Sequence, residues 1–415
     1  MTVKEPSGTG VLRRLNTVAV LTAVRSAGDA GARIAELATD TRLTRPTVAQ
    51  AIDDLVAGRY VLGIAAGSGR PTVGRPAMRY RLRPGLLPVL GLDIGPHRLS
   101  AAVSDLQGVR LAAADRAVRP PRNAASVSKQ LTALIDRVLR ATGLEQEQIA
   151  SVVAGSPGVI EVDEADVRMA PSVPGWAASG VFSALSRRFA GRAMVENDAN
   201  LAAVAAAAEH PGRTLVVIHW GERLGAGIVI DGALHRGAHR AAGEIGMIPV
   251  SAAGVRFDDE GRGPLEHLLG AAGIVANARA TAEGFPDSSL AGVDQLTAQD
   301  VFAAAERGDP AAVRVTARVA RVMIQRLAPV ILTVDPDALV LSGGVARAGA
   351  FLVDQLRREL PRYTLVPPEL QVRPDADRAV LDGALSMARS RAWDRLTDQL
   401  RNGDTGRSPR PIPDE

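Results

Sequence analysis

The stretch from His219 to Gly232, HWGERLGAGIVIDG, contains glycines of the kind that build a phosphate-binding loop. Gly221, Gly225 and Gly227 lie between two apolar runs, and a tight turn of this composition exposes backbone N–H groups that can hold a phosphate. Glu222 lies in the same turn. Because a carboxylate at low effective dielectric repels a polyphosphate by roughly several kcal/mol, we expect this loop to bind another ligand or none.

A second group that could do chemistry is Asp198, in AMVENDANLAAVAAAAEH, where an expected strand turns into a helix. A carboxylate at such a junction can face a cleft and accept a proton from a hydroxyl nucleophile. The alternative is that Asn197 or Asp198 simply caps the helix, which is the commoner role of these residue types. Both interpretations stay open.

A third feature is the glycine pair in PDALVLSGGVARAGAFLVDQL. Gly343 and Gly344 lie between an expected strand and an expected helix, an arrangement that lets a nucleotide approach a helix N-terminus. A lone glycine pair is a weak indication of a nucleotide site.

Two similar strand meanders must position these residues. PVLGLDIGPHRLSAAVSDLQGVRLAA predicts three strands with turns at Gly95 and Gly108. RTLVVIHWGERLGAGIVIDGALHRGA repeats that plan with turns at Gly221 and Gly232. Each meander is followed by helical segments, so we expect two similar α/β lobes that face each other across a cleft.

The segment RIAELATDTRLTRPTVAQAIDDLVAGRYV, ahead of the body, predicts two short helices and a strand. Thr39 to Thr41 form a polar break, Thr44 is placed to cap the second helix, and Gly58 ends it. Pro46 is tolerated in the first turn. The apolar positions of the inward faces are Ile34, Leu37 and Ala38 in the first helix and Val48, Ile52 and Leu55 in the second.

Polar residues on the outer face of the second helix are suited to reading DNA. Arg45, Thr47 and Gln50 can reach base edges in a major groove, with arginine suited to guanine and glutamine to adenine. The strands YVLGI and MRYRL flank a loop with two Gly-Arg-Pro triplets, whose Arg70 and Arg75 suit a narrow minor groove. We expect a winged helix-turn-helix; the alternative is a small helical bundle with a solvated polar face and an ordinary basic turn.

Charge divides the chain in the same way. Residues 1–83 hold thirteen Lys and Arg against six Asp and Glu, and the remaining residues hold 36 against 39. A basic front end on a slightly acidic body is typical of a nucleic-acid-binding module, although a basic tail that aids solubility has the same composition.

Composition excludes several classes of protein. The chain has no cysteine, which excludes disulfides, thiolate zinc sites and cysteine nucleophiles. No run approaches 18 apolar residues, and MTVKEPSGTG lacks the apolar core of a signal peptide. We therefore expect a soluble, intracellular protein without a membrane partner. Together with the expected DNA-binding segment, the expected location is the bacterial cytoplasm, in association with the nucleoid.

Five segments together carry a specific resemblance. GLDIG, VENDANLAA, GAGIVIDGALHRGAHRAAGEIG, LEHLLG and LVLSGGVA, in this order, closely resemble the ROK family of repressors and sugar kinases over roughly Val11 to Ala392. The resemblance implies an α/β chain in which an N-terminal winged helix-turn-helix precedes a two-lobed actin-like sugar-kinase fold. The expected parts are a winged helix-turn-helix at 1–84, a first lobe at 85–198 that a C-terminal helix near 383–398 completes, a second lobe at 199–382 and a disordered tail at 399–415.

The resemblance also implies site residues. The family's sugar-binding and catalytic carboxylates fall on Asp198, Glu244 and Glu266, with Asn197 beside them. A family histidine that contacts sugar and ligates zinc is replaced by Met247. We expect a sugar site of these five residues, with Asp198 vestigial as a catalytic group.

The family's zinc site is interrupted in this chain. Its other ligand positions hold Phe257, Asp259 and Pro264. A thioether, a phenyl ring and a proline cannot hold zinc, so we expect no metal and no cofactor.

Both family phosphate loops depart from the pattern. His97 replaces the threonine that follows Asp93 and Gly95, and Glu222 and Arg223 replace Thr-Gly after Gly221. Pairing of Glu222 with Arg223 stays open. We expect neither nucleotide binding nor ATP-dependent catalysis. The degenerate nucleotide positions are Asp93, Gly95, Gly221, Glu222, Gly343 and Gly344.

These features together predict a regulator and no enzyme. We expect a repressor of carbohydrate-related genes that binds a pseudo-palindromic operator in double-stranded DNA as a homodimer or tetramer and senses a sugar or its derivative. One alternative is a regulator with a dead sugar pocket that answers to a protein partner or to nothing. The other is a sugar kinase fused to a DNA-binding domain.

Overall fold

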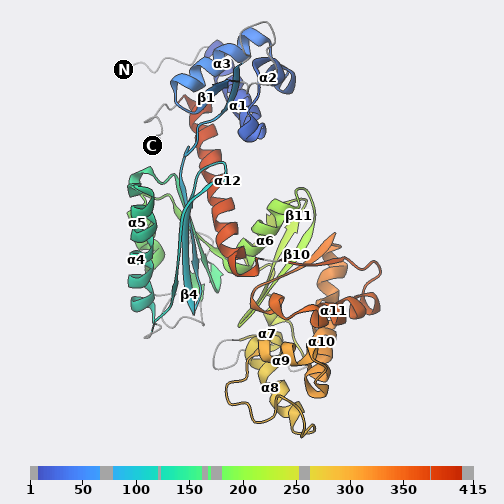
Figure 1. The fold of residues 1–415 in the computed structure, drawn as a ribbon. Coiled ribbons are helices and arrows are strands. Elements are labelled where there is room, and N and C mark those ends of the chain that lie inside the picture. Colours follow the sequence, from blue (N-terminus) through green and yellow to red (C-terminus); the bar gives the residue numbers. More distant parts are fainter. Residues whose placement is uncertain are drawn as a thin grey trace.

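The computed structural model of the chain describes residues 8–65, 78–119, 123–160, 167–169, 180–251, 262–373 and 375–403. Figure 1 shows a small N-terminal unit, which we call the head (residues 8–82), above a body of two lobes. Each lobe is built on one five-stranded sheet. In the described part of the chain, no helix has the length and apolar character needed to cross a membrane.

Over its described residues the head contains three α-helices, a short 3-10 turn (Gly28–Ala30) and two paired strands. The elements are α1 (Gly8–Ser26), α2 (Ile34–Thr41), α3 (Arg45–Ala57), β1 (Val61–Ala65) and β2 (Met78–Leu82). Strands β1 and β2 pair antiparallel. The order of α2, α3 and the hairpin is the predicted one, whereas the sequence pattern did not predict α1.

The predicted break over Thr39 to Thr41 is wrong, since α2 continues to Thr41. The hydroxyl of Thr39 donates to the carbonyl of Ala35 at 3.1 Å, and that of Thr41 donates to Leu37 at 2.6 Å. The helix therefore satisfies these polar groups internally. It ends at Arg42, whose left-handed backbone has φ of 57°.

The signals for α3 are confirmed. The Thr44 hydroxyl accepts a hydrogen bond from the N–H of Thr47 at 3.4 Å, Pro46 lies in the first turn, and Gly58 is the C-cap. The helix buries the predicted stripe of Val48, Ile52 and Leu55.

The first lobe contains a sheet with strand order β5-β4-β3-β6-β9. Its strands are β3 (Val89–Ile94), β4 (Arg98–Ser104), β5 (Arg110–Ala117), β6 (Ser151–Ser156) and β9 (Ala193–Asn197). Helices α4 (Ala124–Thr142) and α5 (Val181–Arg188) cover its outer face, and β7 (Val159–Ile160) pairs with β8 (Val167–Met169).

The second lobe repeats this topology with strand order β12-β11-β10-β13-β14. In both sheets an antiparallel meander of three strands is extended by two parallel strands, which confirms the predicted duplication. The strands are β10 (Leu215–Trp220), β11 (Leu224–Ile230), β12 (Ala233–His235), β13 (Ala338–Ser342) and β14 (Glu369–Val372). The helices are α7 (Pro264–Leu269), α8 (Ala271–Ala282), α9 (Ala298–Glu306), α10 (Pro310–Val334) and α11 (Ala350–Tyr363).

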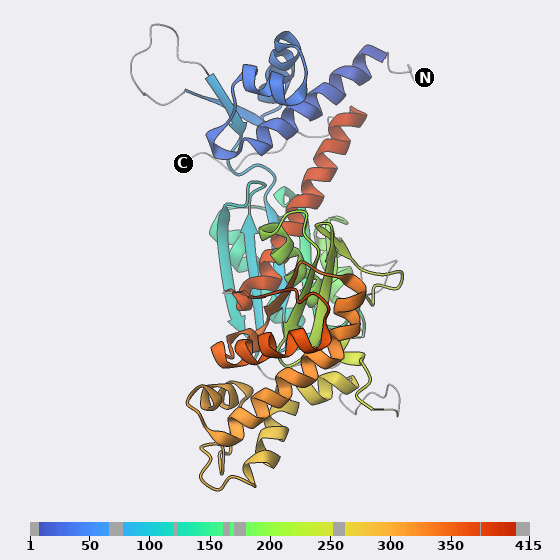
Figure 2. The same cartoon turned by 90° about the vertical axis from the view of Figure 1, so that its right-hand side faces the viewer.

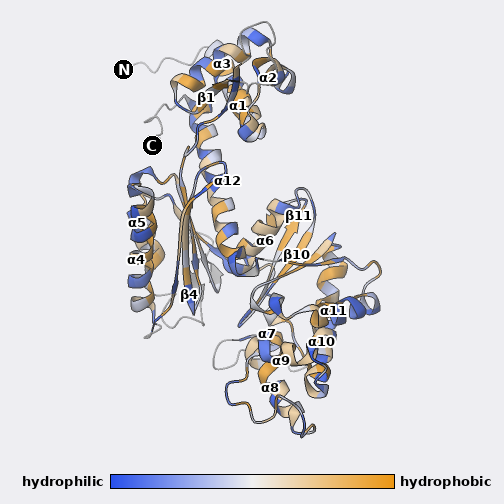
Figure 3. Cartoon of the chain, in the orientation of Figure 1, coloured by the Kyte–Doolittle hydropathy of each residue, from blue (hydrophilic) through white to orange (hydrophobic). Residues whose placement is uncertain are grey.

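The central strands are largely apolar and buried because both of their faces are covered. All residues of β13 are buried, as are those of β6. Figure 3 shows the same contrast, with mainly hydrophobic β10 and β11 and hydrophilic residues along the outer helices α4 and α5.

Two helices join the parts of the molecule. Helix α6 (Asp198–Glu209) packs along α12 (Ala379–Asn402), and α12 also packs on β3 and β6. A side chain at Gly383 would collide with the carbonyl oxygen of Leu201, so glycine permits this close approach.

The far end of α12 reaches the head (Figure 2). The Arg25 guanidinium lies 4.4 Å from the Trp393 ring centre, and Arg14 Nε donates to the carbonyl of Arg401 at 2.8 Å. The tail predicted from residue 399 is wrong over 399–402, which are helical, because Leu396 and Leu400 pack on the core shared with the head. Residues 404–415 lie outside the described residues.

Candidate functional site

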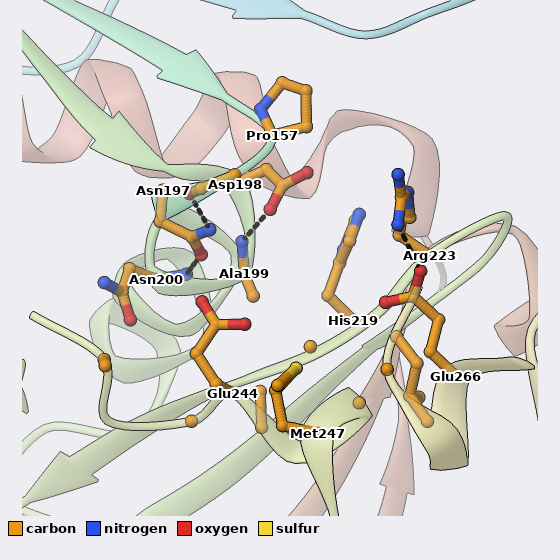
Figure 4. Close-up of a pocket in the computed structure, with 18 of the residues that line it drawn as sticks. Pro157, Asn197, Asp198, Ala199, Asn200, His219, Arg223, Glu244, Met247 and Glu266 are labelled. Carbon is orange, nitrogen blue, oxygen red and sulfur yellow. Dashed lines mark hydrogen bonds and ion pairs between the residues drawn. The ribbon is translucent and has the colours of Figure 1, made fainter. Parts of the chain in front are cut away.

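A cavity of about 300 Å³ lies where the two lobes meet. Its walls come from the ends of β6 and β9, the start of α6, the β10–β11 loop, the segment 240–247 and the start of α7. Figure 4 shows its lining. All five residues predicted for sugar binding line this one cavity: Asn197, Asp198, Glu244, Met247 and Glu266.

The strand-to-helix junction supplies two of these residues, with different roles. Asn197 is the N-cap of α6, since its Oδ1 accepts from the N–H of Asn200 at 3.1 Å and its Nδ2 donates to the carbonyl of Gly158 at 3.0 Å. Asp198 accepts from the N–H of Ala199 at 2.7 Å. Capping therefore accounts for Asn197, while the Asp198 carboxylate lines the cavity at the positive end of a helix.

The carboxylates of this region repel one another. Burial raises the pKa of Glu244 to about 7, and the charges of Asp198 and Glu266 add to the effect. Burial also raises the pKa of Asp198 and of Glu266. Burial and the nearby Asp198 raise the pKa of Asp93 to about 7. Such a cluster favours a ligand that brings hydrogen-bond donors, such as hydroxyl groups.

The buried Glu266 is held by an arginine from the β10–β11 loop. Arg223 Nη1 donates to Glu266 Oε1 at 2.5 Å. The partner of Glu222 lies in the other lobe, since His97 Nε2 and Glu222 Oε2 are 2.7 Å apart. The structure thus pairs Arg223 with Glu266 and Glu222 with His97.

The His97–Glu222 contact joins the two loops that the sequence analysis identified as degenerate phosphate-binding loops. His97 lies in the β3–β4 turn after Asp93 and Gly95, and Glu222 lies in the β10–β11 turn. The third glycine loop adjoins the second, because a Cβ placed on Gly221 would lie 3.7 Å from the backbone nitrogen of Gly344. Gly343 has φ of 82° and packs against the Trp220 backbone.

Sequence reasoning did not single out several cavity residues, two of which carry ionisable side chains. His219 and Arg240 both line the cavity. The Nδ1 of His219 is buried and has no hydrogen-bond partner among the described residues. A histidine inside the apolar run TLVVIHW was the available signal, since a polar side chain in a buried strand needs a partner or a ligand. No sequence signal singled out Arg240.

The residues present do not fit a zinc site. Met247 faces the cavity and Pro264 begins α7, and neither side chain ligates zinc. Phe257 and Asp259 lie outside the described residues. Within the described ranges no group of three or more His, Cys, Asp or Glu is placed to hold a metal ion.

The head presents a polar face on α3. Arg45 and Gln50 are exposed, and Thr47 is half-buried with its hydroxyl 2.8 Å from that of Thr44. Gln50 Nε2 donates to Asp54 at 3.3 Å, and Asp54 accepts two bonds from Arg13 at 2.6 and 2.9 Å. The predicted wing residues Arg70 and Arg75 lie outside the described residues.

Comparison with known proteins gives consistent matches. The ROK family matches residues 89–391. The glucokinase of Halalkalibacterium halodurans is 27% identical over 286 residues, which are 66% of this chain and 86% of that protein. The xylose repressor of Caldicellulosiruptor bescii is 22% identical over 360 residues, which are 83% of this chain and 88% of that protein.

A solved structure extends the likeness. The crystal structure of a ROK family transcriptional regulator, a homolog of the E. coli MLC protein, superposes with a TM-score of 0.76 and 20% identity. The superposition covers 94% of this chain and 99% of that chain. This coverage exceeds the body at 89–391, so the likeness in fold includes residues of the head.

Proposed function

The chain belongs to the ROK family, and on that premise we propose that it is a DNA-binding transcriptional regulator whose body binds a sugar or a sugar derivative. The observation that carries the proposal is the head, a helical unit with a hairpin that precedes the family body. Its helix α3 exposes Arg45 and Gln50 at its N-terminal end, where a recognition helix contacts bases.

DNA recognition would use both parts of the head. Arg45, Thr47 and Gln50 would contact base edges from α3, although Thr47 is half-buried. Arg70 and Arg75 would reach an A/T-rich minor groove. Two heads related by a two-fold axis require a pseudo-palindromic operator with half-sites separated by whole helical turns, about 10 bp each. We infer a repressor that acts as a dimer or tetramer in the cytoplasm.

The phosphate loops argue for a regulator and against a kinase. Phosphoryl transfer depends on donors and cations that surround the phosphates. Here Glu222 places a carboxylate in one loop, and its contact with His97 crosses to the other loop. The relatives include both a glucokinase and a repressor, so this part of the proposal rests on the loops of this chain and not on the comparisons. Asp198 would then remain as a hydroxyl-binding group without a phosphate to transfer.

Sugar sensing follows from the cavity and its place between the lobes. Asp198, Glu244 and Glu266 supply acceptors for hydroxyl groups. A ligand that contacts both lobes favours one degree of lobe closure, and α12 contacts both the first lobe and the head. Closure would thereby alter the spacing of two heads on DNA.

One alternative rests on Met247, which removes a polar contact from the cavity. In that case the cavity would bind no sugar, and a protein partner or nothing would control DNA binding. A second alternative, a sugar kinase joined to a DNA-binding head, rests on the retained Asp198.

The experiment that tests the proposal is selection of genomic DNA fragments by the purified full-length chain. We expect enrichment of fragments that share one pseudo-palindromic motif, and loss of that enrichment in the Arg45→Ala, Gln50→Ala double variant. Enrichment that survives in the double variant, or no shared motif, would contradict the regulator proposal. Thermal shifts with sugars and an assay of ATP turnover then separate the three possibilities.

A further inference from the structure

We propose that the cavity selects a sugar in which an apolar group replaces one hydroxyl, as in a deoxy or O-methyl sugar, and that Met247 determines this selection. The inference rests on the proposed sugar binding and specifies its ligand class. It follows from where Met247 lies, from the neighbours of its side chain and from the chemistry of a thioether.

The backbone of Met247 is fixed against the cavity wall. Its N–H donates to the carbonyl of Glu244 at 3.1 Å within the short 3-10 turn Ile245–Met247. A Cβ placed on Gly263 would lie 2.9 Å from the Met247 Cα, so these two segments are in close contact. The side chain is half-buried and lies between Glu244 and His219 in Figure 4. Because the backbone is held at the cavity wall, a ligand that fills this part of the cavity contacts the thioether.

The carboxyl groups around Met247 favour a ligand that brings hydrogen-bond donors. The side-chain carboxyl of Glu244 has no hydrogen-bond or ion-pair partner among the described residues, and burial raises its pKa. Asp198 accepts from one backbone N–H. Hydroxyl groups of a sugar would supply the donors that both carboxyls lack. The acids therefore define where hydroxyls bind.

His219 would contact a different part of the ligand from the carboxyl groups. Its buried Nδ1 has no partner among the described residues. Because Nδ1 is buried, Nε2 is the ring nitrogen that remains for a ligand. A proton on Nε2 makes this atom a donor at the cavity, opposite in character to the carboxyls. Donors toward the acids and an acceptor toward His219 together orient the sugar.

Met247 then meets the remaining face of that oriented ligand. A thioether donates no hydrogen bond and accepts only weakly, so a hydroxyl placed on it loses its water partners without replacement. A methyl or methylene group at the same place gains dispersion contact and loses no hydrogen bond. The cavity should therefore discriminate at one carbon of the ring.

The test measures dissociation constants by calorimetry for a panel in which each hexose is compared with its deoxy and O-methyl derivatives at every carbon. We expect the full-length wild-type chain to bind a derivative at one carbon at least about tenfold more tightly than the parent. Met247→Gln should reverse or abolish this preference at that carbon only. Met247→Leu, the matched control, should retain it.

Three outcomes would overturn the inference. The first is a wild-type chain that binds parent sugars as well as every derivative, which leaves the proposed sugar sensing intact. The second is a folded Met247→Gln variant with an unchanged preference, which reassigns the selection to another residue. The third is no binding by any sugar, which removes the proposed sugar sensing as well. The wild-type comparison decides the ligand class even when a variant fails to fold.

Discussion

The carboxyl group of Glu244 lies among other acids, and no residue in the described part of the chain forms an ion pair with it. Burial, together with Asp198 and Glu266, raises its pKa to about 7, well above the value of a free glutamate. The folded chain thus retains a proton that the unfolded chain releases at lower pH. Cavity residues are often arranged for ligand binding at the expense of stability, and this carboxyl is such a case.

The first prediction concerns the pH dependence of stability. A raised folded pKa destabilises the fold as pH rises from the unfolded value toward about 7, and the penalty is fully present above that pH. Glu244→Gln removes the penalty. We expect the variant to exceed the wild type in free energy of unfolding by on the order of 2 kcal/mol at pH 8, and by much less at pH 5. Urea denaturation at both pH values measures this, and equal differences would contradict it.

The second prediction concerns Gln50, on the proposed recognition face. Its amide donates to Asp54 at 3.3 Å in the absence of DNA, a long bond that a base edge can replace. Gln50→Ala should relax base preference at one position of each half-site, at a cost of about 1 to 3 kcal/mol.

Arg75→Ala is the matched comparison, since loss of an arginine from the minor groove should weaken binding and reduce the salt dependence by about one charge. Competition assays on operator variants at two salt concentrations distinguish the two effects. A uniform loss in Gln50→Ala would show that Gln50 does not contact bases.

At the scale of elements, the two strand meanders and the order of the head followed directly from the sequence, whereas β6 and β14 were not predicted. Alternating apolar runs between glycine turns predicted the meanders, and a threonine cap with an apolar stripe predicted α3. The polar break at Thr39 to Thr41 failed because threonine hydroxyls can bond to the preceding turn of a helix. Helix α1 was missed although Leu21 and Val24 form part of a buried stripe.

The candidate site also contains features that the sequence predicted and one that it did not. Family resemblance placed the residues that line the cavity, and the structure brings all five together. The His97–Glu222 contact could not be predicted, because it joins residues 125 positions apart on different lobes. Local patterns carry no information on such a contact, which depends on how the lobes face each other.

The third prediction concerns this contact between the two loops. Both side chains are more than half exposed, so the pair contributes at most about 1 kcal/mol, which changes the population of the closed form by about fivefold. We expect His97→Gln and Glu222→Gln each to increase the open population. The exchange of both residues, His97→Glu with Glu222→His, should restore the wild-type distribution.

Spin labels provide the measurement. The chain has no native cysteine, so Ala117→Cys on β5 and Ala276→Cys on α8 give one label in each lobe. Distance distributions between the labels report lobe closure directly. Identical distributions in the wild type and both single variants would show that the pair does not influence closure.

At the scale of the whole molecule, α12 is a helix that contacts the first lobe, the head and α6, which lines the cavity. It packs along α6, whose first residue lines the cavity, and it lies on the central strands of the first lobe. Its last turns contact the head through Trp393 and the carbonyl of Arg401. A rigid helix that contacts both ends transmits a change in one as a displacement at the other, provided that its contacts hold.

The fourth prediction concerns coupling between ligand and DNA on the proposed function. The cation–π contact between Arg25 and Trp393, at 4.4 Å, is worth roughly 0.5 to 2 kcal/mol and joins α12 to the head. Trp393→Ala should weaken that junction. By linkage, the factor by which a sugar alters operator affinity equals the factor by which the operator alters sugar affinity.

We expect Trp393→Ala to reduce both factors equally toward one, while sugar affinity without DNA stays close to that of the wild type. Trp393→Phe, which retains an aromatic face for Arg25, should keep most of the coupling and serves as the control for packing. Titrations of sugar with and without operator, and of operator with and without sugar, measure both factors. Full coupling in Trp393→Ala would show that another contact links the cavity to the head. Reduced sugar affinity without DNA would show that the substitution disturbs the cavity through α6, and a loss of coupling would then not be assigned to the head junction.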